Sequence, residues 1–248
     1  MFFLIGSAQP ARDPENRSNE VIRFLANSAT GTVSAVMRLF NYEVVKVRDL
    51  DNQLEVRHRF RGSDTCGGGS PRMELAIDLD GDRDSEGNVF VYFGTPPSFA
   101  NCQAQTWLYE DFTGGDGITG LGPEPSTGDP GRREKDGGPN EELEVDTSQL
   151  AAPDVGEDPG PVIPPQPFVI SWSAFETVLE AFPDHRVCSA AYVDDVGAPP
   201  FFNPAENTGV SHVDLLSIGD ATLNGREDIA TKPALPSDTC SVPVRKHD

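Results

Sequence analysis

Several short segments of the chain alternate apolar and polar residues, which is the pattern of half-exposed antiparallel strands. Apolar residues occupy every second position from Val33 to Met37, and charged residues do so within residues 54–60. Residues 21–26 lead into the first strands, and further strand-like segments cover residues 42–47, 186–193, 212–218 and 220–223. The pattern predicts an all-β fold, namely an antiparallel, jelly-roll-like β-sandwich.

The clearest hairpin joins residues 72–79 to residues 88–93. Met73, Leu75 and Ile77 are expected on one face of its first arm, and the second arm is a run of β-branched and aromatic residues. Residues 80–87 between the arms are acidic and rich in turn-forming types. The sequence therefore predicts a half-buried hairpin with an acidic tip.

One short helix is predicted after residues 168–170. Ser173 and Glu176 have the spacing of a capping box, in which each side chain satisfies a free backbone N–H. Pro183 is expected to end this helix, because proline cannot continue the hydrogen-bond ladder. The apolar residues with helical spacing are Phe175, Val178, Leu179 and Phe182.

Composition divides the chain into four segments. Gly, Pro, Asp and Glu dominate residues 113–166 and aromatic residues are absent there, so this stretch is interpreted as a flexible acidic insertion that cannot bury enough apolar surface. Within it, residues 143–150 alternate and are expected to pair as an edge strand before Pro153. The predicted segments are a flexible start (1–20), the first part of the sandwich (21–112), the insertion (113–166), and the second part of the same sandwich with a short tail (167–248).

Charge and hydropathy limit the classes of partner. Asp and Glu outnumber Lys and Arg by 40 to 19, which gives a formal net charge of −21. Such a surface does not attract a phosphate backbone, so a nucleic-acid partner is not expected. The sequence contains no apolar run near the roughly 18 residues that a transmembrane helix needs, so membrane insertion is not expected either.

The four cysteines indicate the compartment. Cys66, Cys102, Cys188 and Cys240 show no C-x-x-C spacing, which disfavours structural zinc. Of the three connectivities, we favour Cys66 with Cys102 and Cys188 with Cys240, because each pair closes a loop within one half of the chain. Lasting disulfides imply an oxidising compartment and hence an extracellular or cell-surface location. A cytoplasmic protein with four free thiols is the alternative.

The first residues are interpreted as the stub of a signal peptide. Residues 1–5 are apolar but too short for the hydrophobic region of a secretion signal, and residues 7–11 resemble a small-residue processing site. A second export-related feature is the formal N-glycosylation sequon Asn16-Arg17-Ser18, which matters only if the source glycosylates exported proteins.

The acidic hairpin tip is the segment with the clearest candidate chemistry. Carboxylates recur at every second position, in Asp78, Asp80, Asp82 and Asp84. Carboxylate oxygens are the ligands that Ca²⁺ prefers, so calcium is the predicted cofactor. The segment departs from an EF-hand loop, since Arg83 stands where that loop has glycine and Val89 where it has glutamate. The alternative is a solvated acidic turn without a metal.

Two further sets of residues suggest contact with glycans. Trp107, Tyr109 and Trp172 lie near predicted loops and could stack on sugar rings, or they could belong to the core. Three carboxylates, Glu142, Glu144 and Asp146, alternate as the paired acids of a glycosidase strand would. They lie in the insertion, with no aromatic cleft near them in sequence, so the catalytic interpretation is the weaker one.

The residues 64–72, which include Cys66-Gly67-Gly68-Gly69-Ser70-Pro71-Arg72, precede an Asp-Leu-Asp-Gly-Asp hairpin that leads into residues 89–94. Together with residues 146–149 and 212–219, they resemble a set of uncharacterised secreted bacterial β-sandwich proteins. The resemblance implies export, a jelly-roll-like sandwich and a Cys66–Cys102 disulfide, but no activity.

The expected function is therefore that of a non-catalytic secreted or cell-surface protein, with carbohydrate binding or matrix association as the specific roles considered and an extracellular glycan or surface component as the partner. The sequence has no nucleophile elbow, P-loop or dinucleotide-binding glycine motif. The alternative is a secreted glycan-active hydrolase on a sandwich scaffold.

Overall fold

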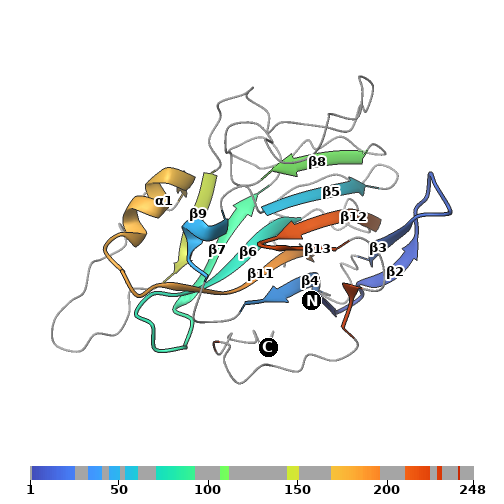
Figure 1. Cartoon of the computed structure of the whole chain (residues 1–248). Coiled ribbons are helices and arrows are strands. Elements are labelled where there is room, and N and C mark those ends of the chain that lie inside the picture. Colours follow the sequence, from blue (N-terminus) through green and yellow to red (C-terminus); the bar gives the residue numbers. More distant parts are fainter. Residues whose placement is uncertain are drawn as a thin grey trace.

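The computed structural model describes residues 2–25, 33–40, 45–50, 54–60, 71–92, 107–111, 144–150, 169–195, 210–223, 228–230 and 240. In this part of the chain two antiparallel β-sheets pack against each other, and one α-helix follows the end of the larger sheet (Figure 1). No helix among the described residues is long and apolar enough to cross a membrane.

The larger sheet has the strand order β1-β4-β11-β6-β7-β9-β10. Its strands are β1 (Phe3–Ile5), β4 (Val33–Leu39), β6 (Arg72–Asp78), β7 (Gly87–Tyr92), β9 (Glu144–Leu150), β10 (Val169–Ser171) and β11 (Arg186–Asp195). The smaller sheet has the order β2-β3-β12-β5-β8, with β13 paired to β12. Its strands are β2 (Gln9–Arg12), β3 (Glu20–Leu25), β5 (Leu54–Phe60), β8 (Trp107–Asp111), β12 (Val210–Ile218) and β13 (Ala221–Leu223).

Eight of these strands pair in a nested order. The outermost pair is β3 with β12, followed inward by β4 with β11, β5 with β8, and finally β6 with β7. Successive pairs fall alternately in the smaller and the larger sheet. This is the arrangement that results when one long antiparallel hairpin rolls up into two sheets, so the predicted jelly-roll-like β-sandwich is confirmed.

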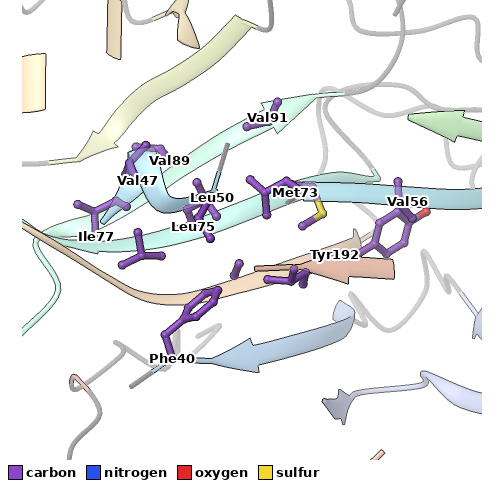
Figure 2. Close-up of a cluster of buried hydrophobic side chains, with 14 of the residues drawn as sticks. Phe40, Val47, Leu50, Val56, Met73, Leu75, Ile77, Val89, Val91 and Tyr192 are labelled. Atoms are coloured by element: carbon purple, nitrogen blue, oxygen red, sulfur yellow. The ribbon is translucent and has the colours of Figure 1, made fainter. Parts of the chain in front are cut away.

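The core lies between the sheets and confirms the predicted face of the hairpin. Met73, Leu75 and Ile77 of β6 are fully buried, and they lie beside Val89 and Val91 of β7 (Figure 2). Alternation puts them on one face of the strand, where burial of each side chain stabilises the fold by roughly 1.5–3 kcal/mol. The opposite sheet contributes Phe24, whose ring centroid lies 5.2 Å from that of Tyr192 in β11.

The first residues of the chain belong to the folded domain, so the prediction of a flexible segment over residues 1–20 is wrong. Phe2 is buried in the core, and β1 pairs with β4. The N–H of Phe2 donates to the carbonyl of Asp228 at 3.1 Å, and the N–H of Ala230 donates to the carbonyl of Phe2 at 2.7 Å. Ser7, in the presumed processing site, donates to the carbonyl of Leu25 at 2.6 Å. Processing there would remove a core strand.

A 3₁₀ helix, Val47–Leu50, replaces the end of the strand predicted at 42–47. The side chain of Asp49 accepts the N–H of Lys46 at 2.9 Å, which closes a local turn in place of a sheet hydrogen bond. Val47 and Leu50 are both buried, as the three-residue period of such a helix allows. Residues 41–44 lie outside the described part of the chain.

The helix α1 (Trp172–Leu179) is present but begins and ends earlier than predicted. Its N-cap is Ser171, whose side chain accepts the N–H of Ala174 at 3.2 Å, whereas Ser173 lies inside the first turn. Two serines two residues apart offer alternative caps, and burial of Trp172 favours the earlier one. The helix ends at Leu179, ahead of Pro183.

The described part of the predicted insertion is β9, which is not an edge strand. It pairs with β7 on one side and with β10 on the other, so β10 forms that edge of the sheet. Gly87 makes the close approach to β9 feasible, because a Cβ there would lie 1.9 Å from the backbone oxygen of Gln149. Residues 113–143 and 151–166 are outside the described ranges.

The predicted Cys188–Cys240 disulfide is confirmed. Cys188 is an extra residue in β11, since the register with β6 shifts between Val187 and Ser189. The bulge turns Cys188 away from the main core, and both cysteines pack beside Ala76 in a small cluster of their own. The other predicted pair, Cys66 and Cys102, falls outside the described residues.

Candidate metal site

The turn between β6 and β7 is organised around one buried carboxylate. Asp78 ends β6, and its side chain accepts the N–H of Gly81 at 2.7 Å and that of Arg83 at 2.9 Å. Gly81 and Arg83 have φ angles of 83° and 80°, so the backbone passes through the left-handed region twice. A buried carboxylate needs such donors, and here the turn itself supplies them.

The next two aspartates repeat a tighter version of the same contact. Asp80 accepts the N–H of Asp82 at 3.1 Å, and Asp82 accepts the N–H of Asp84 at 2.7 Å. Both are Asx turns, in which a side-chain oxygen caps the backbone two residues later. These contacts hold the two exposed carboxylates near the buried one.

The last carboxylate comes from the returning arm. Glu86 accepts the N–H of Leu79, while its own N–H donates to the carbonyl of Ile77 at 3.0 Å. Ser85 supports the arm by donating to the carbonyls of Ile77 at 3.1 Å and Gly87 at 2.9 Å. The two arms of the hairpin are thus fastened together directly below the tip.

Four residues of this tip form the candidate site. One carboxylate oxygen each from Asp78, Asp80, Asp82 and Glu86 can be chosen so that all lie within 4.8 Å of one another. Two ligands on opposite sides of one Ca²⁺ are separated by about twice a Ca–O distance of roughly 2.4 Å, which is the same span. The arrangement could therefore hold a metal ion.

The predicted ligand set needs one correction. Asp84 is exposed and does not belong to the cluster, and Glu86 takes its place. Asp84 was predicted because acidic residues alternate along the segment. The chain turns between β6 and β7, however, so residues two apart no longer lie on one face there. The hairpin register offered a better signal, because Ile77 pairs with Gly87 and therefore brings their neighbours Asp78 and Glu86 together.

The cluster disfavours its own full ionisation. Burial, followed by the charges of Asp78 and Asp80, raises the pKa of Glu86 to about 7 against the opposing backbone hydrogen bonds. Burial also raises the pKa of Asp80, with the charges of Asp82 and Asp78 acting in the same direction. Crowded carboxylates are relieved either by a proton or by a cation. The site is therefore electrostatically suited to a positive ion.

The predicted aromatic platform is not supported by the structure. Trp107 is only 5% exposed and Trp172 only 3% exposed, so neither offers a ring face to a sugar. Trp172 instead packs edge-on against Phe175, with ring centroids 6.2 Å apart. Both tryptophans lie near predicted loops in the sequence, but their side chains are buried. The side chain of Tyr109 lies outside the described part.

The carboxylate trio of the hydrolase alternative gains no support. Asp146 is on the face of β9 opposite Val145 and Thr147, which are buried, and it accepts the N–H of Ser148 at 2.8 Å. Glu142 and the side chain of Glu144 lie outside the described residues. A catalytic pair at this strand stays a prediction.

Comparisons with protein-family models, with curated proteins and with solved structures gave no match. The resemblance to secreted bacterial β-sandwich proteins accordingly stays a prediction, and the case for function rests on the hairpin tip.

Proposed function

We propose that the chain is a non-catalytic, exported β-sandwich protein, a surface or matrix component, whose β6–β7 hairpin tip binds calcium. The observation that carries the proposal is the convergence of four carboxylate oxygens within 4.8 Å on one short turn. A hydrated acidic turn without a metal would be more stable with its carboxylates further apart, because like charges at this distance repel one another.

The donor set favours calcium over other metals. All four ligands are carboxylate oxygens, which suit hard cations, whereas zinc and copper sites normally include nitrogen or sulfur. Calcium accepts six to eight oxygens in adaptable geometry, while magnesium demands a nearly regular octahedron. Backbone carbonyls or water would complete the calcium shell.

The position of the site suggests a stabilising role. The hairpin β6–β7 is the innermost pair of the jelly roll, and its arms contribute several of the fully buried core residues. A calcium ion at the tip would remove the mutual repulsion of the carboxylates and hold the two arms in register. Extracellular calcium modules bind in the range of about 10⁻⁴–10⁻³ M, which fits a structural ion outside the cell.

The disulfide supports export, and the charge limits the partners. The Cys188–Cys240 disulfide would persist in an oxidising compartment. The formal net charge of −21 favours solubility and disfavours nucleic-acid binding.

Thermal unfolding of the oxidised protein, with calcium and with chelator at constant ionic strength, tests the proposal. At calcium of about 100 times Kd the folded state gains about 2.7 kcal/mol, which raises Tm by roughly 5–10 °C for a chain of this size. Asp82→Asn should lose most of this rise. Asp84→Asn is the matched control, because it removes the same charge from the same turn outside the cluster.

An equal Tm in calcium and chelator would overturn the calcium site. An equal response of Asp82→Asn and Asp84→Asn would show that calcium acts only by screening the acidic surface. Magnesium at the same concentration should give a smaller rise than calcium.

A further inference from the structure

The hairpin between β2 and β3 projects a short polar tip into solvent. Asn16, Arg17 and Ser18 are exposed, and they form the N-x-S sequon noted in the sequence. Below the tip, the N–H of Asp13 donates to the carbonyl of Asn19 at 3.1 Å. The side chain of Asp13, itself buried, accepts the N–H of Glu15 at 2.7 Å. The base of the hairpin is therefore fixed while the sequon is accessible.

The side-chain oxygen of Asn16 accepts hydrogen bonds, whereas its side-chain nitrogen is available for reaction. Oδ1 of Asn16 accepts the hydroxyl of Ser18 at 2.6 Å and the N–H of Ser18 at 3.2 Å. Within the described part of the chain, nothing hydrogen-bonds to Nδ2 of Asn16. The folded hairpin tip can therefore accommodate a modified Asn16, because a large group on Nδ2 would extend into solvent.

We propose that Asn16 is an acceptor site for an N-linked glycan. This inference rests on the export that the proposed function includes, because the transferase acts on chains that cross a membrane. Nδ2 of Asn16 would attack the anomeric carbon of a lipid-linked oligosaccharide diphosphate. The new bond joins Nδ2 to that carbon, the bond from that carbon to the diphosphate oxygen breaks, Nδ2 loses a proton to a base, and the lipid diphosphate leaves.

The glycan would lie beside a sheet edge. In the described structure β2 forms one edge of the smaller sheet, and it is only four residues long and contains Pro10. Short, proline-containing edges are a device against pairing with other chains. A hydrated glycan on the adjoining turn would add a steric barrier to the same edge.

The test is expression of the whole chain behind a secretion leader in a eukaryotic cell, followed by peptide-N-glycosidase treatment in heavy-oxygen water and peptide mass analysis. Most of the chain should carry a glycan, and the enzyme should leave a labelled aspartate at position 16. Ser18→Ala should abolish the label, and Ser18→Thr should restore it. Asn16→Gln should lose the glycan and keep the same Tm.

The label at position 16 is measured both in the secreted protein and in the protein that stays inside the cells, so that poor secretion does not hide the result. An unlabelled Asn16 in folded, disulfide-bonded protein would overturn the acceptor site. Because the leader imposes export, this result would leave the calcium proposal and its melting test untouched.

Discussion

The carboxylate of Asp78 accepts the backbone N–H of Arg83, five residues further along the chain, at 2.9 Å. The same side chain also accepts the N–H of Gly81, so one buried acid determines the path of the whole turn. This role is separate from metal binding, and the two can be distinguished by mutation.

Asp78→Asn should destabilise the protein even in chelator. An amide offers one oxygen where the carboxylate offers two, and its NH₂ group would face a backbone donor. A buried donor left without an acceptor costs about 1–3 kcal/mol. Urea unfolding in chelator measures the change, with Asp82→Asn as the control whose carboxylate is exposed. Equal stability of the two variants would contradict the organising role of Asp78.

Gly87→Ala should separate β9 from β7. Gly87 has a φ of 151°, and an added Cβ would meet the backbone oxygen of Gln149 at 1.9 Å. Backbone cannot move aside as a side chain can, so we expect a loss of roughly 2 kcal/mol or more in unfolding free energy. Faster amide hydrogen exchange in β9 would locate the damage. Exchange unchanged from the wild type would show that the sheet tolerates the methyl group.

His185 should make the protein sensitive to mild acid. Burial, helped by the charges of Lys46, Arg186 and Arg48, lowers the pKa of His185, although the contact of Nδ1 with the Phe182 carbonyl at 2.8 Å opposes this. The unfolded state therefore takes up the proton first. Stability is complete above the unfolded pKa of about 6.5 and falls as the pH drops from there toward the folded pKa.

His185→Asn removes this titration and keeps a donor for the Phe182 carbonyl. Unfolding free energies at pH 7.5 and 5.5 (roughly one unit on either side of the reference pKa), both in chelator, should differ less in the variant than in the wild type. A pH dependence that does not involve residue 185 is common to both proteins and cancels in the comparison. The same pH dependence in both would assign the acid sensitivity to other groups.

Phe2→Ala should be strongly destabilising despite its place next to the first residue. Phe2 is 1% exposed within the main core, and truncation of a buried phenylalanine typically costs about 3–5 kcal/mol. Ile5→Ala is the control three residues later, at the end of β1, because Ile5 is 39% exposed. Chemical denaturation gives both values, and a small effect at Phe2 would mean that the first residues fray in solution.

The alternating segments of the sequence predicted most of the sandwich. β4, β5 and β6 appear where polar and apolar residues alternate, and β7, β11 and β12 appear at the other segments that were predicted as strands. In β6 the predicted inward face is buried in full, because a period of two leaves only one way to place the apolar side chains against the core.

Short segments without a measurable period were missed. Phe3–Ile5 is too brief to show alternation, and an apolar start suggests targeting as readily as a strand. At Val47 a local hydrogen bond from Lys46 to Asp49 outweighed the β-branched composition of the strand predicted at 42–47. Phe3–Ile5 is placed by its pairing with β4, which the local sequence does not reveal, whereas the contact between Lys46 and Asp49 is local and competes with strand formation.

The candidate site was predicted in part for a related reason. Asp78, Asp80 and Asp82 were identified from spacing, but Glu86 joins them only because the chain reverses. The sequence left both exposure and burial open for Trp107 and Trp172, and the tertiary packing of β8 and α1 buries them.

The nested pairing of the strands also constrains when the protein can fold. β3 and β4 have as principal partners β12 and β11, which lie more than a hundred residues later in the chain. A growing chain therefore cannot complete either sheet until nearly all of it has been synthesised, and such distant contacts form slowly. The polypeptide would remain unfolded enough to pass through a membrane channel for most of its synthesis, and the disulfide between Cys188 and Cys240 could form only after residue 240 has been synthesised.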